Sequence, residues 1–325
     1  MTPSLSIVVT GRHDNYGRDF NDRFFAALRF NLAALADRGV AAEFILVEWN
    51  PIANTPFLAE LLEDAFPAGS PHTLRCFVVD PGYHGALTQN PQVAYLEYLA
   101  KNVGVRRASA PLLLVTNTDV FLGREVVGAI ADRRPVPRTI YRAARYDVKI
   151  GVDQSHLSWA VLEDPETHVR RPTLKPPLLS GGTGDFILAH RDAFHDLRGF
   201  NEVYRAARLG IDLNFVVKAR GAGYAIADVG GPVYHVNHVG SYRISKGAYR
   251  DSGAQTPWGD LGWNYRSVVY NNRDDWGLHG APARRLSDTA TYLEFDRRLV
   301  PPIAELRRIV LPALVDAADA AEISG

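Results

Sequence analysis

The sequence has almost no cysteine, no long apolar run and no excess of either charge. Its 325 residues include one cysteine, Cys76, which excludes a disulfide framework or a cysteine-rich metal site. No uninterrupted apolar segment reaches the ~20 residues that a membrane-spanning helix needs. The first residues lack a basic leader followed by a long apolar stretch, so no signal peptide is expected. These absences predict a cytoplasmic protein without a transmembrane segment.

The balance of charge also limits which classes of partner are expected. Lysine plus arginine and aspartate plus glutamate each number 36, which gives a formal net charge of zero. A nucleic acid or a membrane surface held by bulk electrostatics is therefore not an expected partner. Hydrophobic residues make up 46% of the chain, which is enough for a sizeable core.

Strand-like and helix-like patterns alternate along the first 120 residues. Short apolar runs rich in β-branched residues predict buried strands at 5–10, 43–47, 74–79 and 111–116. Apolar residues at helical spacing predict helices between them, over 24–35, 56–66 and 93–103. Continuously apolar strands in this order predict an α/β fold with a doubly wound, mostly parallel sheet that is Rossmann-like and covered on both faces.

The second half is less regular. Strands are expected at 139–143, 185–189, 224–229 and 233–236, with a helix over 210–220. Residues 240–295 show little periodicity and are rich in Gly, Asn, Asp, Tyr and Trp, which is typical of functional loops or a lid. Trp258, Trp263 and Trp276 lie there and suit either stacking on a sugar or ordinary packing. Segment 302–315 is predicted to be an amphipathic helix.

Polar residues follow each of the four expected parallel strands, at 11–14, 48–50, 80–82 and 117–119. Ligands of such sheets bind beyond the carboxyl ends of the strands. Asp119 closes the last of these segments, and a carboxylate there can hold a hard divalent cation that in turn binds a diphosphate. The alternative is that Asp119 only caps a turn or a helix.

Two further regions carry a recognisable pattern. Residues 100–108 read AKNVGVRRA, while 197–204 read LRGFNEVY and are followed by GIDLN at 210–214 and RGAGY at 220–224. This order resembles glycosyltransferase family 2 and its GT-A relatives. In those enzymes an A-x-N-x-G-x-x-x-A helix precedes a metal-binding Asp-x-Asp strand, and a G-G-F-D-E-x-Y turn leads to an acidic helix that ends R-x-x-G-Y.

The resemblance covers about residues 4–240 and implies a GT-A fold. Residues 1–240 would form the nucleotide-sugar-binding and catalytic domain. Residues 241–325 would supply an irregular, loop-rich acceptor or lid region and a terminal helix, packed on the same domain.

Carried over to the matching positions, the resemblance implies a donor site. Glu48 would contact the uridine or other base, and Lys101 and Asn102 would line the nucleotide pocket. Asp119 would coordinate Mn²⁺ or Mg²⁺, while Asn117 would reach the ribose or the donor sugar.

The resemblance also implies groups around the acceptor. Asp212 would be the general base that deprotonates the acceptor hydroxyl, which gives inversion in a single displacement; a helix first-turn role is the alternative. Gly182 and Asp185 fall in a glycine-containing segment expected near the donor sugar and acceptor. Arg243 could neutralise the diphosphate leaving group or be a solvated surface charge.

Further metal ligands are sought at His235 and His238, where some relatives supply a histidine. Two histidines three residues apart in an extended segment are expected to point to opposite faces, so both are not expected to bind one ion. His238 is the preferred ligand, with ordinary packing as the alternative. Arg145 and Asp147 could position a substrate or form ion pairs.

The predicted activity is transfer of a sugar from a UDP- or GDP-sugar to a hydroxyl of a carbohydrate or other acceptor. Asn117 replaces the first carboxylate of Asp-x-Asp, and Ile211 replaces the glutamate before the expected base. These departures keep open a catalytically silent nucleotide- or sugar-binding protein on the same fold. A sugar-phosphate nucleotidyltransferase is a further alternative, which segment 11–14 disfavours because it lacks several glycines.

Overall fold

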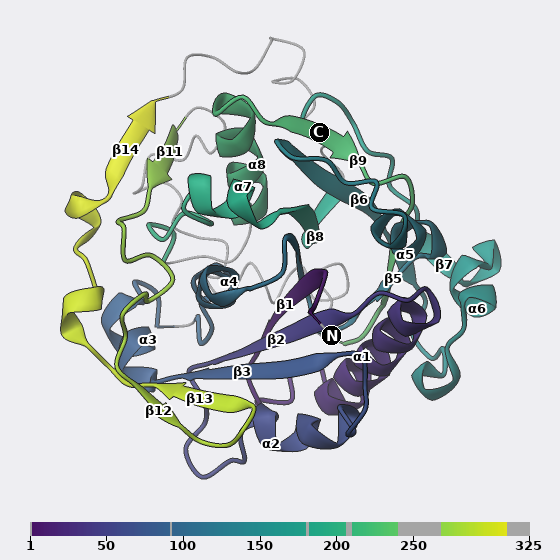
Figure 1. Ribbon diagram of the computed structural model, residues 1–325, viewed down its shortest axis with the longest axis horizontal. Coiled ribbons are helices and arrows are strands. Elements are labelled where there is room, and N and C mark those ends of the chain that lie inside the picture. The colour runs from purple at the N-terminus through teal and green to yellow at the C-terminus, as the bar shows by residue number, and fades with distance from the viewer. Residues whose placement is uncertain (1, 92, 180–181, 206–209, 240–267, 311–325) are drawn as a thin grey trace.

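The computed structural model describes residues 2–91, 93–179, 182–205, 210–239 and 268–310 (Figure 1). Its centre is one large mixed sheet. In spatial order its strands are β12 (Ala283–Arg285), β13 (Ala290–Leu293), β3 (Thr73–Val79), β2 (Ala42–Trp49), β1 (Leu5–Gly11), β4 (Leu112–Thr116), β8 (Gly182–His190), β6 (Thr139–Val148), β10 (Val233–Val236) and β5 (Val120–Leu122). Strands β7 (His168–Arg170) and β9 (Ala225–Asp228) also pair with β6, whereas β11 (Val268–Asn271) and β14 (Arg307–Val310) form a separate antiparallel pair.

Strands β13, β3, β2, β1 and β4 run parallel, and β8 is antiparallel to both of its neighbours, β4 and β6. Every residue of β1 and β2 is buried. A strand covered on both faces needs apolar side chains in succession, which explains the continuous apolar runs in the sequence. The predicted α/β fold class with a mostly parallel sheet is confirmed.

Helices cover both faces of the sheet, as Figure 1 shows. On one face lie α1 (Phe20–Asp37), α2 (Leu58–Leu62) and α5 (Arg124–Ala131), and their apolar side chains share a core with Ile7 and Val9 of β1. On the other lie α4 (Glu97–Arg107), α7 (Arg191–Asp196) and α8 (Ile211–Gly221), whose core includes Val8. The shorter helices are α3 (Pro81–Leu87) and α6 (Trp159–Glu163), with 3₁₀ turns at Glu63–Ala65, Gln154–His156, Pro165–Thr167, Arg297–Leu299 and Ile303–Glu305.

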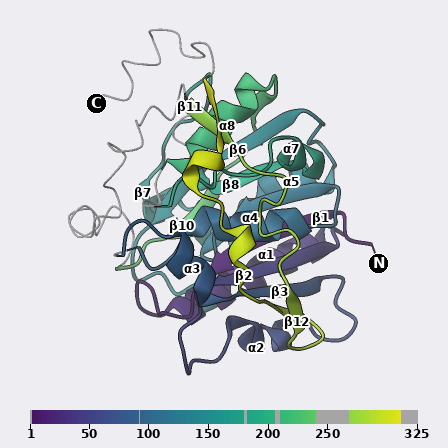
Figure 2. The same ribbon diagram turned by 90° about the vertical axis from the view of Figure 1, so that its left-hand side faces the viewer.

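Three segments differ from the expectation. The helix expected over 93–103 begins at Glu97, although Val93 and Leu96 are buried before it. The described part of 302–315 forms a 3₁₀ turn and β14 instead of a helix, because Ile309 and Val310 pair with β11. Strands β12 and β13 arise within the expected loop region. Strand β13 pairs parallel with β3 and β12 pairs antiparallel with β13, so the edge of β3 is covered. Figure 2 shows this yellow-green segment, labelled β12, beside β3.

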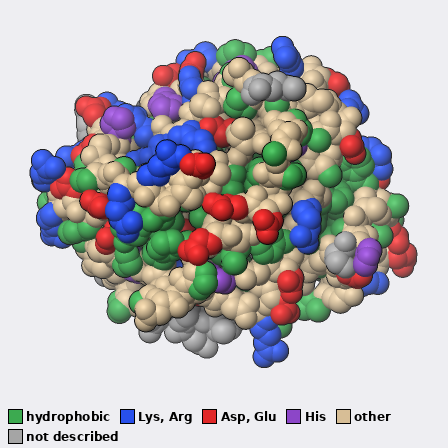
Figure 3. Space-filling view, turned by 60° about the horizontal axis from the view of Figure 1, so that its bottom comes forward, with side chains coloured by type: hydrophobic (Ala, Val, Ile, Leu, Met, Phe, Trp, Pro, Cys, Tyr) green, Lys and Arg blue, Asp and Glu red, His purple; other side chains and the backbone are tan. Residues whose placement is uncertain are grey.

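No helix within the described ranges has both the length and the apolar character needed to cross a bilayer. Charged side chains of both signs are scattered over the face in Figure 3, in line with the zero net charge of the sequence. The use of residues 241–325 as an acceptor region stays a prediction, because 240–267 and 311–325 lie outside the described residues.

Candidate metal centre and active site

A cavity of about 370 Å³ opens at the carboxyl ends of β1 and β4, where the polar segments of the sequence predicted a ligand site. The loop after β1, the start of α4, the segment after β4, the start of α8 and residues of β6, β7, β8 and β10 all contribute to it. Its lining consists of Thr10, Gly11, Arg12, Asp14, Tyr16, Phe20, Tyr95, Glu97, Tyr98, Asn117, Thr118, Asp119, Arg145, Arg170, Gly184, Asp185, Gly210, Asp212, His235 and His238.

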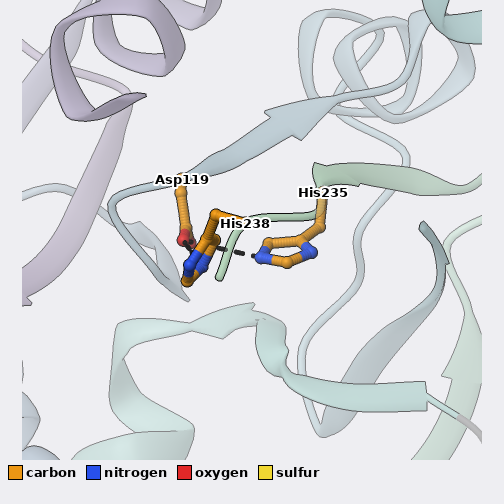
Figure 4. Close-up of side chains that lie close together, drawn as sticks. All are labelled: Asp119, His235 and His238. Carbon is orange, nitrogen blue, oxygen red and sulfur yellow. Dashed lines mark ion pairs between the residues drawn. The ribbon is translucent and has the colours of Figure 1, made fainter. Parts of the chain in front are cut away.

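Three of these side chains form a compact cluster, drawn in Figure 4. Asp119 follows β4, His235 lies in β10 and His238 lies just beyond it. The Asp119 Oδ2 atom is 3.5 Å from His235 Nε2 and 3.3 Å from His238 Nε2. One ligand atom from each residue lies within 4.8 Å of the others, and both histidines are buried. The spacing suits a single divalent cation between the three.

The expectation that the two histidines face opposite ways is wrong. Strand β10 ends at Val236, so the two-residue alternation of side chains stops before His238 is reached. The chain then turns the His238 ring back toward His235, and the ring centroids lie 5.4 Å apart. Tyr16 packs edge-on against His238 from the loop after β1.

The charges in the cluster depend on one another. Burial alone would raise the pKa of Asp119, but His235 and His238 hold that pKa well below the ordinary aspartate value. Burial would lower the pKa of His235, yet the charge of Asp119, with support from Asp147, raises it to about 9. For His238, burial dominates over the nearby Asp119 and lowers the pKa. The raised pKa of His235 means that its ring carries a proton whose charge balances the Asp119 carboxylate. A cation placed between these ligands would replace that proton.

The donor set also bears on which cation fits. Carboxylate oxygens alone suit Mg²⁺ and Ca²⁺, whereas imidazole nitrogen suits first-row transition metals. One carboxylate and two imidazoles therefore suit a first-row transition-metal ion better than Mg²⁺.

A hydrogen-bonded network forms the wall beside the metal cluster. Asn117 donates from Nδ2 to Asp185 Oδ1 at 2.5 Å and accepts from Lys101 Nζ at 2.8 Å. Arg145 Nη1 lies 2.5 Å from the other Asp185 oxygen. Burial would lower the pKa of Arg145, but the carboxylates of Asp185 and Asp147 outweigh burial and raise that pKa above the usual arginine value. The Lys101 ammonium also pairs with Glu97 Oε1 at 2.7 Å. Asn117 is thus held by both of its neighbours and faces the cavity in a fixed orientation.

Three of the predicted nucleotide-binding side chains do not line the cavity. Glu48 is 2% exposed and accepts a hydrogen bond from the Leu58 backbone N–H at the start of α2. Lys101 is fully buried behind Asn117. Asn102 ties α4 to the turn after α7, since it donates to and accepts from the backbone of Phe200. In this structure they shape the walls from behind, and a direct contact to a nucleotide stays a prediction.

Asp212 lies at the start of α8 and faces the cavity. Its Oδ2 atom is 3.3 Å from Nη2 of Arg142, whose side chain is buried. Burial raises the pKa of Asp212 above the usual aspartate value, while Arg142 opposes the rise. Gly184 of β8 allows the close approach: a Cβ there would lie 2.2 Å from the Tyr98 hydroxyl and 2.8 Å from Asp212 Cβ.

The remaining predicted residues lie in the sheet, in the core or outside the described residues. Gly182 pairs with Ala144 in the sheet, near the wall that Asp185 forms. Arg243, Trp258 and Trp263 lie outside the described residues. Trp276 is 1% exposed and packs in the core, so ordinary packing describes it and stacking on a sugar does not.

Several cavity residues were not singled out from the sequence, Arg170 and Tyr16 among them. Arg170 reaches the cavity from β7, a three-residue strand with no periodic pattern that pairs with the end of β6. Tyr16 reaches it from an irregular loop in which Gly17 adopts a φ of 70° beneath His238. Neither position carries a sequence signal, because both depend on how the chain turns outside regular elements.

Comparison with known proteins gives similarity of fold alone. No protein-family model and no curated protein sequence matches the chain. A structure of S. aureus TarS residues 1–349 aligns at 11% identity over 75% of this chain and 63% of that chain, with a TM-score of 0.42. The complex of that fragment with UDP-GlcNAc aligns at 10% identity over 74% and 61%, with a TM-score of 0.42.

GalNAc-T7 with UDP, GalNAc and Mn²⁺ aligns at 13% identity over 80% of this chain and 50% of that chain, with a TM-score of 0.46. The chain therefore spans less than two thirds of each of these solved structures. Its similarity to these structures is one of fold alone.

Proposed function

We propose that the chain is a metal-dependent glycosyltransferase that moves a sugar from a UDP- or GDP-sugar to a hydroxyl-bearing acceptor. The observation that carries this proposal is that one cavity is lined by both the Asp119–His235–His238 cluster and the Asp212 carboxylate. Such a displacement needs positive charge at the leaving diphosphate and a base at the attacking hydroxyl. The residues that would hold the charge-bearing cation and the carboxylate that would act as the base line this one cavity.

At the donor end, Asp119, His235 and His238 would hold the cation. The cation, when bound, supplies charge that stabilises the departing diphosphate. Arg145 and Arg170 line the same cavity and add two cationic side chains that can donate to phosphate oxygens. Asn117 offers an amide to a ribose or sugar hydroxyl from a position fixed by Asp185 and Lys101.

At the acceptor end, Asp212 would take the proton of the attacking hydroxyl. A carboxylate whose pKa is raised by burial is a stronger base than a solvated aspartate. Attack by the activated hydroxyl on the face opposite the diphosphate inverts the configuration at the anomeric carbon. The Arg142 guanidinium keeps the carboxylate in one orientation.

The same ion pair favours a second candidate, a catalytically silent nucleotide-sugar-binding protein. A carboxylate that accepts from a guanidinium is a weaker proton acceptor than a free one. Asn117 also brings no charge to the metal site. Binding without turnover of any donor would favour this candidate.

The experiment combines binding with turnover on the same proteins. Thermal melts of the wild type with UDP, GDP and their sugars, with and without Mn²⁺, should show one nucleotide that stabilises the protein only with the metal. Asp119→Ala should abolish that shift, whereas Asp132→Asn, at an exposed carboxylate that follows the last residue of α5, should preserve it. Release of UDP or GDP from the stabilising sugar nucleotide should require Asp212, so that Asp212→Asn binds the donor without turning it over. If no nucleotide shifts the melt under any condition, the proposal is wrong.

A further inference from the structure

A second buried carboxylate lies behind the metal cluster. Asp147 stands at the end of β6 and is 0% exposed. Strands β6 and β10 are parallel neighbours, and their register places Asp147 directly beside His235. The Asp147 Oδ1 atom is 3.4 Å from His235 Nδ1, while the other ring nitrogen, Nε2, faces Asp119 at 3.5 Å. One imidazole ring therefore lies between two carboxylates, with one ring nitrogen toward each.

Burial of Asp147 is costly for the fold. A buried carboxylate needs well-aligned hydrogen bonds to offset the loss of water. Among the residues that the structure describes, none donates a hydrogen bond of good geometry to either Asp147 oxygen, and His235 Nδ1, 3.4 Å away, likewise lacks an aligned partner. Arg145 Nε at 2.9 Å and Arg170 Nη1 at 3.7 Å supply opposite charge without that alignment. Fold stability alone does not account for an acid at this position.

We propose that Asp147 is a positioning residue that holds the proton of His235 on Nδ1 and so presents the Nε2 lone pair to the cation. This inference rests on the proposed metal centre. A neutral imidazole carries one N–H, and the nitrogen without it is the metal ligand. Because a carboxylate only accepts, it selects the tautomer in which the facing nitrogen is protonated. Metal-bound histidines commonly make this kind of outer contact, and its loss typically costs 10–100-fold in metal affinity.

The alternative is that Asp147 serves only to neutralise the charges of Arg145 and Arg170, and the geometry argues against it. Arg145 already has a closer partner, since its Nη1 lies 2.5 Å from Asp185. The Arg170 side chain is 28% exposed and its Nη1 is 3.7 Å from Asp147. Neither arginine needs a fully buried acid, whereas the His235 side chain is only 6% exposed and therefore needs a protein group to orient its ring.

The first test measures Mn²⁺ binding to the full-length, metal-free protein by titration calorimetry, without any turnover assay. Asp147→Asn is expected to weaken Mn²⁺ binding 10–100-fold, because the amide can donate to Nδ1 and stabilise the wrong tautomer. In a His235→Ala background the same Asp147→Asn change should have little further effect, since its partner is gone. An acid that served only the arginines would weaken binding equally in both backgrounds, and that result overturns the proposal.

The second test needs no variant and so does not depend on how Asp147→Asn folds. Two-bond ¹H–¹⁵N correlation spectra of the wild type with Zn²⁺, a diamagnetic probe, report the tautomer of each ring. The proposal requires the Nδ1–H form for His235, and an Nε2–H ring bound through Nδ1 contradicts it.

Failure of the metal centre looks different. If the wild type binds neither ion, or Asp119→Ala binds as tightly as the wild type, the proposed function and this inference both fail. If Asp119→Ala loses the metal while Asp147→Asn keeps it, only the role of Asp147 fails.

Discussion

The guanidinium of Arg142 lies 3.3 Å from the carboxylate of Asp212, and the Arg142 side chain is buried behind it. The pair links the middle of β6 to the first turn of α8 across the cavity wall. Burial raises the pKa of Asp212, and Arg142 limits that rise. Burial and the Arg142 charge therefore set the strength of the proposed base in opposite directions, and a substitution of Arg142 separates the two effects.

Replacement of Arg142 should shift the acid limb of the pH–rate profile. A base acts in its ionised form, so kcat/KM falls as the pH drops through the pKa of Asp212. Removing the cation leaves burial unopposed and raises that pKa further, which moves the acid limb of Arg142→Gln to higher pH. Asp212→Asn should lower kcat by roughly 10²–10⁴-fold at pH values above the pKa of Asp212, and its profile should lack the acid limb.

The profile is measured with the donor and metal that the melts identify, and thermal melts check that Arg142→Gln is folded. Breaking a buried ion pair costs about 3–5 kcal/mol, so the assay temperature must lie below the variant's melting point. A profile that moves to lower pH, or Asp212→Asn with wild-type turnover, would contradict the assignment of the base.

Glu48 should make the wild type less stable as the pH rises from about 4 to 8. Burial raises the pKa of Glu48 to about 7, whereas in the unfolded chain it is close to 4.5. Between these values the folded protein binds a proton that the unfolded chain has lost, so the free energy of unfolding falls with rising pH. The shift corresponds to a loss of about 3 kcal/mol that is complete above the folded pKa.

Urea unfolding of the wild type and Glu48→Gln across this pH range measures the effect. The difference between the two stability curves should slope downward up to about pH 7 and then become flat. Glu166→Gln, at an exposed carboxylate, is the matched control and should give no such slope. A flat difference curve for Glu48→Gln would show that the carboxylate is hydrated.

Metal binding should depend on His238 and favour Mn²⁺. Loss of one imidazole removes one of three protein ligands, so His238→Ala should weaken Mn²⁺ binding by tenfold or more. His156→Ala removes a histidine that is 83% exposed and should leave binding unchanged. Isothermal titrations with Mn²⁺ and Mg²⁺ check both points, and tighter binding of Mg²⁺ would argue against nitrogen ligands.

The sequence predicted the sheet well because its strands are buried on both faces. Continuous apolar runs such as those of β1 and β4 predict a parallel α/β core. Because Asp119 follows the carboxyl end of β4, it then falls at the edge of the sheet where ligands bind. The same reasoning could not place Glu48. Side chains alternate between the two faces along β2. The Glu48 carboxylate falls on the face that α2 covers, where it accepts a hydrogen bond from the Leu58 N–H.

Other features depend on registers and turns that local patterns do not encode. Asp147 meets His235 only because β6 and β10, about ninety residues apart, pair in one register. His238 joins the cluster because the strand ends two residues earlier. The β12–β13 hairpin lies in a stretch whose polar composition hid its pairing with β3.

Gly184 should tolerate no side chain. A Cβ would lie 2.2 Å from the Tyr98 hydroxyl and 2.8 Å from Asp212 Cβ, so Gly184→Ala must displace β8, the start of α4 or the proposed base. Overpacking of this kind costs about 1–3 kcal/mol, and a displaced Asp212 should lower kcat more than donor affinity. Gly85→Ala is the matched control: its Cβ would meet nothing within 4 Å, and in α3 alanine favours the helix by up to about 1 kcal/mol. Urea unfolding and steady-state kinetics on both variants measure these effects. Wild-type kcat in Gly184→Ala would show that the close contact between β8 and Asp212 does not position the base.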